Sequence, residues 1–204
     1  MSGNSKNQSR REQIRQRQRK QQSSSKLIFS IAGAGVVVVL GYLLFSFDRP
    51  DAPEGDVGIL VDLMEPSDHV ADGTNVEYST NPPTSGPHYG QPMPAGVYNA
   101  SQNTVIFPES HIVHSLEHGY VVFWYNCSNL PVSECDELLG QIRAVLDDVG
   151  EAKVIVYPWS TIDEPLVMTS WGAIQPFPVF DAQLAADFVL ANRSNPRAPE
   201  PNVQ

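Results

Sequence analysis

The chain has 204 residues and a formal net charge of -10 at pH 7, which hides two parts of opposite charge. Residues 1–26 contain eight Lys or Arg and one acidic residue, whereas the rest of the chain contains five Lys or Arg and 22 acidic residues. A domain this acidic repels nucleic acid and anionic surfaces but tolerates cations, so the composition argues against nucleic-acid binding.

The N-terminal arm, residues 1–26, is polar, basic and without apolar periodicity, which predicts disorder. Residues 27–47 are 21 residues without a charge. At about 1.5 Å per residue, such a segment can cross a hydrocarbon core of about 30 Å. Ser46-Phe47-Asp48 is a poor cleavage site, so we expect an uncleaved signal anchor in contact with membrane lipid. By the positive-inside rule the arm is cytoplasmic, and the C-terminal domain lies outside a cell membrane that is crossed once.

The remainder divides into three parts. Residues 48–58 are expected to form an acidic linker rich in Pro and Gly. Residues 59–193 are long enough to form one extracytoplasmic globular domain with its own core. Residues 194–204, which contain three prolines, are expected to be a disordered tail.

Residues 81–98 contain five prolines and three glycines, a composition that excludes a regular helix or a central strand. Restricted φ angles reduce the entropy lost when such a loop becomes ordered, so we expect it to present His88 and Tyr89 at a site. The alternative is a Pro-rich spacer. Upstream, residues 69–73 and 76–78 are expected to pair as a hairpin or a short strand pair.

Residues 111–119 (HIVHSLEHG) bring three histidines and a carboxylate next to an apolar run, residues 120–125, that is typical of a buried strand. His114 and His118 are four residues apart, so they share a face in a helix and in a strand, as two ligands of one metal ion require. Gly119 is expected to cap a short helical turn at its C-terminus.

Cys127 and Cys135 are the only two cysteines. Their spacing excludes a CxxC redox pair. The extracytoplasmic location expected for the domain predicts that they form a disulfide, with a thiolate metal site as the minor alternative. Apolar residues from Leu138 to Val149 recur at helical spacing and predict a helix, with a start resembling a capping box at Ser133.

Residues 153–157 and 165–171 are expected to be strands, and Asp181 is expected to cap a last helix. Together with residues 120–125, these elements predict an α/β (α+β) fold, in which helices pack on a small mixed sheet. A thioredoxin-like arrangement is compatible with this element order.

The histidines suggest a metal site, because neutral imidazoles suit zinc, copper, nickel and iron. We expect His88, His114 and His118 to bind the ion, with His69 or Glu117 as the fourth ligand. Met93 and Met168 could act as soft axial ligands for copper, although methionines usually pack in the core. Any single histidine has an ordinary structural role more often than a ligand role.

The spacing His114-x-x-Glu117-His118 also matches the HxxEH pattern of inverted zinc proteases, in which the glutamate is the general base that activates a zinc-bound water. Three fixed positions make this a weak motif. The mechanism also needs a long helix, whereas Gly119 and an apolar run follow at once.

Residues 81–89 (NPPTSGPHY) and 114–119 (HSLEHG) together resemble a bacterial and archaeal domain-of-unknown-function family. The resemblance covers about residues 65–192 and implies a membrane anchor formed by one N-terminal helix. It places the motif histidines of the family at His69, His88, His114 and His118, with Glu117 beside them. His111 has no clear counterpart, and the family has no assigned reaction.

The sequence therefore favours a single-pass membrane protein whose extracytoplasmic domain binds copper or zinc, for metal handling or for a metal-dependent reaction. One alternative is a non-enzymatic envelope module that binds or scaffolds a protein partner and whose histidines are structural. Another is a zinc-dependent hydrolase with Glu117 as its base. The sequence does not decide whether the protein is an enzyme, and it carries no signal for oligomeric state.

Overall fold

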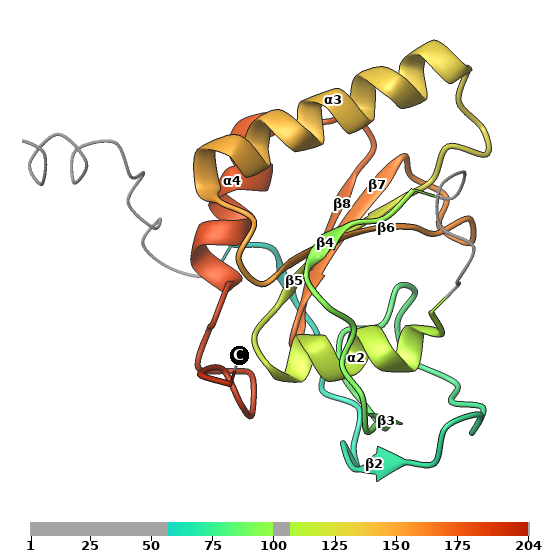
Figure 1. The fold of residues 1–204 in the computed structure, drawn as a ribbon, viewed down its shortest axis with the longest axis vertical. Coiled ribbons are helices and arrows are strands. Elements are labelled where there is room, and N and C mark those ends of the chain that lie inside the picture. Colours follow the sequence, from blue (N-terminus) through green and yellow to red (C-terminus); the bar gives the residue numbers. More distant parts are fainter. Residues whose placement is uncertain (1–56, 100–106, 204) are drawn as a thin grey trace, which may run out of the picture. The chain divides into compact units, whose positions relative to one another are not determined.

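The computed structural model describes residues 57–99 and 107–203 (Figure 1). The predicted basic arm, the predicted membrane anchor and most of the linker lie outside these residues. Within the two described ranges, none of the helices has the length and apolarity that a membrane crossing requires.

A six-stranded mixed sheet forms the centre of the domain. Its strands lie in the order β1-β8-β7-β5-β6-β4. In the middle, β5 runs parallel to β6 and antiparallel to β7. In the described part of the chain three helices pack on the sheet, so the prediction of a mixed α/β fold is confirmed. The strands are β1 (Ile59–Leu60), β4 (Gly96–Val97), β5 (Val121–Tyr125), β6 (Val154–Pro158), β7 (Leu166–Ser170) and β8 (Ala173–Phe177).

All five residues of β5 are buried, which decides how the helices are layered. Successive side chains of a strand point to opposite faces of the sheet. Val121, Phe123 and Tyr125 belong to the core cluster that contains the apolar residues of two helices, α3 (Val132–Val149) and α4 (Ala182–Asn192). Val122 and Trp124 belong to a second cluster on the opposite face, with residues of α2 (Glu109–Glu117).

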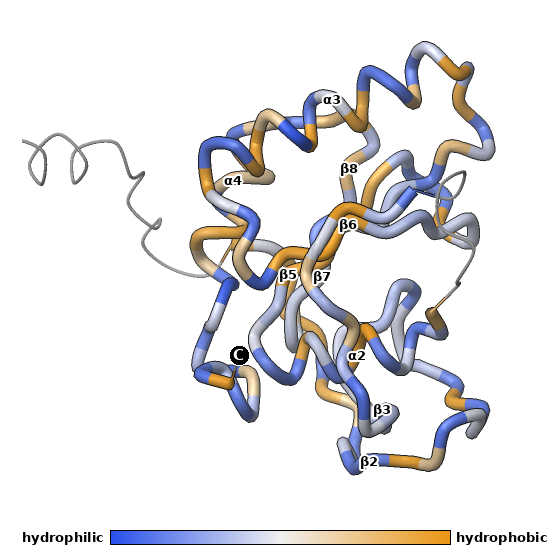
Figure 2. Tube along the Cα trace, viewed as in Figure 1, coloured by the Kyte–Doolittle hydropathy of each residue, from blue (hydrophilic) through white to orange (hydrophobic). Residues whose placement is uncertain are grey.

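The sheet therefore lies between α3 and α4 on one side and α2 on the other (Figure 1). A strand buried on both faces has a continuous apolar sequence rather than an alternating one. Figure 2 shows this as a hydrophobic trace through the middle of the sheet.

Of the two helix starts predicted from the sequence for α3 and α4, only that of α4 is found in the structure. Asp181 caps α4 as predicted, because its carboxylate accepts a hydrogen bond from the backbone N–H of Leu184. The capping box predicted at Ser133 is wrong, since α3 begins one residue earlier, directly after Pro131, and no side chain caps it. A proline can occupy this position because the first N–H groups of a helix have no partner within the helix.

The strand β8 is absent from the sequence prediction. It contains Pro176, which cannot donate a ladder hydrogen bond and therefore weakens the strand signal. The proline is tolerated because β1 pairs only with Ala173 and Ile174, at the start of β8. Among the described residues, the end of β8 that contains Pro176 has no partner strand on that side.

Cys127 and Cys135 form the predicted disulfide, with Cα atoms 5.5 Å apart. The bond links the turn after β5 to the first turn of α3. Both sulfur atoms are used by it, so the alternative of a thiolate metal site is wrong. Disulfides persist in oxidising compartments, which indicates that the domain is extracytoplasmic.

Residues 194–203 pack back against the end of α2, whereas the sequence predicted a disordered tail. The backbone N–H of Ser194 donates to the carbonyl of Gly119, and that of Glu200 donates to the carbonyl of Glu117. The Lys153 ammonium donates to the carbonyl oxygens of His118 and Pro201. We call residues 194–203 the C-terminal segment.

The two-sided burial of β5 predicts a matched pair of stability effects. Val122→Ala removes methyl groups from a side chain with 0% exposure, whereas Val179→Ala removes them from one with 82% exposure. We expect Val122→Ala to lower the free energy of unfolding by about 2 kcal/mol, through lost burial and the cavity left behind. Val179→Ala should change it by less than about 0.5 kcal/mol. Chemical denaturation measures both, and equal effects would contradict this description of the core.

Candidate metal centre

Two short strands bring the first two histidines together. β2 (His69–Val70) pairs in parallel with β3 (His88–Tyr89), and the register places His69 beside His88. The ring centroids of these histidines are 4.9 Å apart. The hairpin predicted between residues 69–73 and 76–78 is therefore wrong. β2 pairs instead with β3, which lies in residues 81–98, the proline-rich loop.

The last turn of α2 supplies the other candidate ligands. His114 and Glu117 lie within the helix, and His118 is its C-cap residue. Gly119 follows with φ 76°, the left-handed backbone that favours glycine, so the predicted cap is confirmed. A Cβ atom at Gly119 would lie 2.9 Å from the Cα of Ser194. The close approach of the C-terminal segment therefore also requires glycine here.

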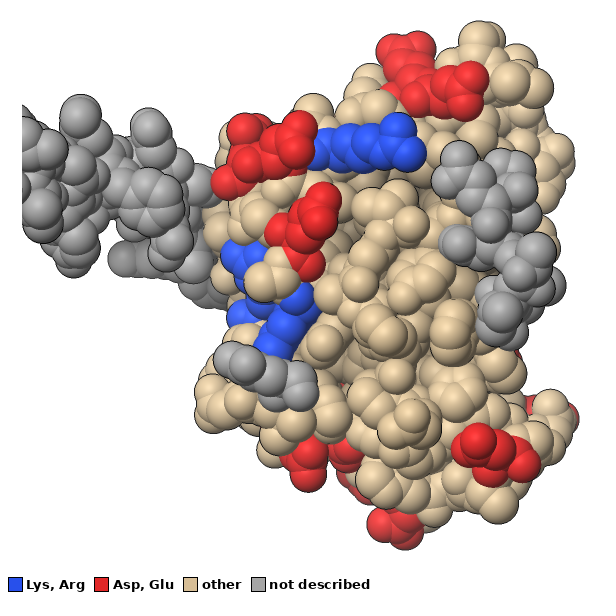
Figure 3. All heavy atoms as spheres, in the orientation of Figure 1, with Lys and Arg blue, Asp and Glu red and all other residues tan. Residues whose placement is uncertain are grey.

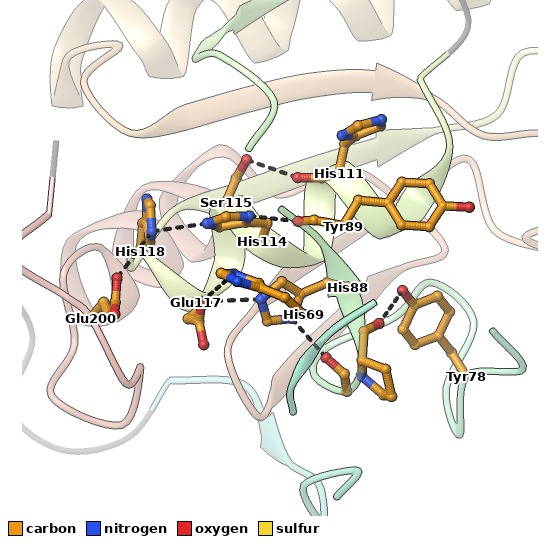
Figure 4. Close-up of polar contacts among 12 residues, drawn as sticks. His69, Tyr78, His88, Tyr89, His111, His114, Ser115, Glu117, His118 and Glu200 are labelled. Carbon is orange, nitrogen blue, oxygen red and sulfur yellow. Dashed lines mark hydrogen bonds and ion pairs between the residues drawn. The ribbon is translucent and has the colours of Figure 1, made fainter. Parts of the chain in front are cut away.

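His69, His88, His114 and Glu117 form the four-residue group, in which one ligand atom from each residue lies within 4.8 Å of all the others. Oε2 of Glu117 is 3.1 Å from Nε2 of His88 and 4.0 Å from Nε2 of His69. Ligands bound tetrahedrally to zinc at 2.0–2.1 Å are about 3.4 Å apart. These spacings are near that value, and Figure 4 shows the side chains turned toward one another.

Two backbone carbonyls determine which ring nitrogens can bind a metal. Nδ1 of His88 lies 2.9 Å from the oxygen of Gly86, and Nδ1 of His114 lies 2.6 Å from the oxygen of Tyr89. A carbonyl only accepts, so each Nδ1 carries the hydrogen and, in the neutral ring, each Nε2 has a lone pair. Metal-binding histidines are commonly oriented in this way.

This arrangement leaves Nε2 of His88 facing a carboxylate oxygen of Glu117. A lone pair and a carboxylate oxygen repel each other unless a proton or a cation lies between them. His88 has 0% exposure, and burial strengthens this effect because water screens it poorly. The contact therefore calls for a positive charge at this point.

His114 is suited to metal binding by its protonation state. The pKa of His114 is lowered to about 4, mainly by burial and to a smaller extent by the neighbouring imidazoles of His118, His88 and His69. The hydrogen bond to the Tyr89 carbonyl acts in the opposite direction but does not outweigh burial. The ring is therefore neutral at pH 7, with its Nε2 lone pair available.

The wider charge distribution also favours a cation. The sequence has no Lys or Arg between Arg49 and Arg143, a span that contains all five histidines. On the face shown in Figure 3, the part over β2 and β3 carries carboxylates and no Lys or Arg. The site lies at the C-terminus of α2, where the helix dipole stabilises positive charge.

A second set of ligand atoms adjoins the first. Glu117, His118 and Glu200 form the three-residue group, again with ligand atoms within 4.8 Å of one another. Nε2 of His118 is 3.2 Å from Oε2 of Glu200 and 3.2 Å from Nε2 of His114. Sequence analysis missed Glu200, because it lies between prolines in a segment expected to be disordered and no spacing pattern marks it.

The other candidates lie outside both groups. His111 is on α2, but its Nδ1 donates to the carbonyl of Gln91 at 2.7 Å. Met93 and Met168 are fully buried in the apolar clusters on opposite faces of the sheet. The structure thus brings His69, His88, His114, Glu117 and His118 into one region, and distributes them over two groups that share Glu117.

The low pKa of His114 predicts a pH dependence of stability for the metal-free protein. Between about pH 6.5 and pH 4 the unfolded imidazole binds a proton that folded His114 does not bind. The free energy of unfolding should therefore fall as the pH falls through this range, by up to about 1.4 kcal/mol per pH unit. Denaturation curves of chelator-treated protein at pH 7, 6 and 5 measure this slope. His114→Asn should reduce the slope and His111→Asn should not; equal slopes in all three proteins would contradict the assignment.

Comparison with protein families identifies the domain. Residues 69–204 match the family described as Protein of unknown function (DUF3105). Neither the comparison with curated proteins nor the comparison with solved structures finds a match. The matched segment begins at His69 and includes the C-terminal segment, so it contains every residue of both ligand groups. The chain therefore belongs to the DUF3105 family of proteins of unknown function.

Proposed function

We propose that this domain binds a divalent transition metal ion, zinc or copper, through His69, His88, His114 and Glu117. Its role would be metal handling or a metal-dependent reaction outside the cytoplasm. One observation carries the proposal: Nε2 of buried His88, whose Nδ1 is held by a backbone carbonyl, faces the carboxylate of Glu117 at 3.1 Å. A metal ion bound between them would remove this repulsion.

The donor set narrows the choice of metal. Three imidazole nitrogens and one carboxylate oxygen suit zinc and Cu(II), whereas Cu(I) prefers the sulfur of cysteine or methionine. In the described part of the chain, Met93 and Met168 pack in apolar clusters and both cysteines are in the disulfide. This supports a site made of nitrogen and oxygen ligands.

Access to the ion would be from the side of His69, whose side chain is 58% exposed. The other three ligands are largely enclosed, since the side chain of Glu117 is 12% exposed and the two remaining histidines are buried. A ligand at the surface can exchange with water or with a metal donor. This supports a metal that is delivered or reacts, rather than one that only stabilises the fold.

The zinc-hydrolase alternative is less well supported. α2 ends at Glu117 after nine residues, and the other histidines of the four-residue group come from short strands, whereas the HxxEH mechanism needs a long helix. Glu117 also lies among the ligand atoms, so it is not a free base beside a metal-bound water.

In the scaffolding alternative, the contact between His88 and Glu117 would need a proton in place of the metal.

The membrane anchor at residues 27–47 and the single-pass topology are part of this proposal. They are supported by the uncharged 21-residue stretch and the basic arm before it.

A thioredoxin-like core is also part of this proposal. It is supported by the strand order β8-β7-β5-β6, in which β7 is antiparallel to both neighbours. No dithiol chemistry accompanies it, because the two cysteines do not form a CxxC pair.

Metal content tests the proposal directly. The full chain, purified without a metal-affinity tag, should retain at least one zinc or copper ion after equilibration and gel filtration. His88→Ala and His114→Ala should lower metal affinity at least about 10-fold, because second-sphere changes alone typically cost 10–100-fold. His111→Ala is the matched control, an imidazole removed from the same helix but outside both groups. No bound metal in the wild type would overturn the proposal.

X-ray absorption spectroscopy provides a second prediction. The metal-loaded protein should show only nitrogen and oxygen ligands, at about 2.0–2.2 Å for zinc, and Met93→Leu should leave the spectrum unchanged. A sulfur shell near 2.3 Å would contradict this donor set.

A further inference from the structure

We infer that the site binds two metal ions rather than one, with the Glu117 carboxylate bridging between them. The second ion would bind to the three-residue group, formed by Glu117, His118 and Glu200. This inference rests on the proposed function and extends it from a mononuclear to a dinuclear centre.

The geometry of the three-residue group resembles that of the first site. Nε2 of His118 and Oε2 of Glu200 are 3.2 Å apart, close to the separation of about 3.4 Å expected between two ligands of one tetrahedral ion. His118 is buried, and Glu117 is a member of both groups. An ionised carboxylate has two oxygens with about four lone-pair sites, so a single glutamate can serve two ions.

The two ions would lie at a spacing known from two-metal sites. His114 belongs to one group and His118 to the other, and their Nε2 atoms are 3.2 Å apart. With each nitrogen about 2.1 Å from its own ion, the ions can lie about 3.5–4 Å apart, as in two-metal hydrolytic centres. With each Nε2 bound to its own ion, neither His114 nor His118 would need to donate a hydrogen bond to the other across this 3.2 Å contact.

The C-terminal segment is held so that Glu200 reaches His118. The backbone N–H of Glu200 donates to the carbonyl of Glu117. One residue further, the carbonyl of Pro201 shares the Lys153 ammonium with the carbonyl of His118. These contacts fix the backbone on both sides of the pair, and the Glu200 side chain, 53% exposed, reaches His118 from there.

The second ion would have three protein ligands and an exposed side. Three protein ligands plus an open position are typical of catalytic zinc sites, in which water or substrate is the fourth ligand. The second ion would therefore bind a water or a small anionic substrate group next to the more enclosed first ion.

Metal stoichiometry of the full chain tests this inference. The protein is stripped with chelator, titrated with Zn²⁺ or Co²⁺ and measured by elemental analysis. We expect two ions per chain in the wild type and one in Glu200→Gln, which removes the charge but keeps the shape of the side chain. Glu109→Gln is the control, the same change at the other end of α2 and outside both groups, and it should keep two ions.

A spectroscopic measurement covers the case in which a variant folds poorly. The wild type loaded with Cu²⁺ should show magnetic coupling between two ions by electron paramagnetic resonance, which needs no variant. One uncoupled ion in the wild type, retained in Glu200→Gln, would overturn the dinuclear centre and leave the mononuclear proposal intact. Two ions in both proteins would also overturn it, because the second ion would then lie elsewhere. No bound ion would overturn both proposals.

Discussion

The burial of β5 on both faces is the constraint on which the rest of the structure depends. All five side chains of this strand need apolar cover, and each face requires its own layer. α3 and α4 together supply one layer. On the other face α2 has only nine residues, so the proline-rich loop and the C-terminal segment complete the cover through Met93 and Ala198. The same packing that closes the core thus brings both segments to α2.

The histidine site follows from that packing. The proline-rich loop crosses α2 closely enough for Ser115 to hydrogen-bond to the backbone of Met93 and for His114 to donate to the carbonyl of Tyr89. Each bond satisfies a buried polar group, which would otherwise destabilise the fold. The bond to Tyr89 also orients the imidazole of His114, so part of the site is built by the contacts that close the core. The remaining contact, between His88 and Glu117, is the place in the site where a proton or a cation would balance the carboxylate.

The two ligand groups differ in how they are built. The four-residue group lies between β2, β3 and α2, and two of its histidines are oriented by carbonyls. The three-residue group depends on the C-terminal segment, which is held by backbone hydrogen bonds and by Lys153. Glu117 joins them because it lies in the last turn of α2, between the strands and the C-terminal segment. A family match that continues past residue 200 agrees with a domain in which this segment is structural.

The sequence by itself determined the elements with strong local signals: the apolar run of β5, the periodicity of α3, the caps at Gly119 and Asp181, the disulfide and the histidine-rich segments. These signals are local because dihedral preference, side-chain periodicity and loop closure act over short stretches. The pairing of β2 with β3, the strand β8 and the position of Glu200 were decided only by tertiary structure. Each depends on a partner that is distant in the sequence, such as His88 for His69 or Glu117 for Glu200. Backbone hydrogen bonds between distant segments leave no pattern in side-chain identity. The sequence therefore located the candidate ligands but could not divide them between two groups.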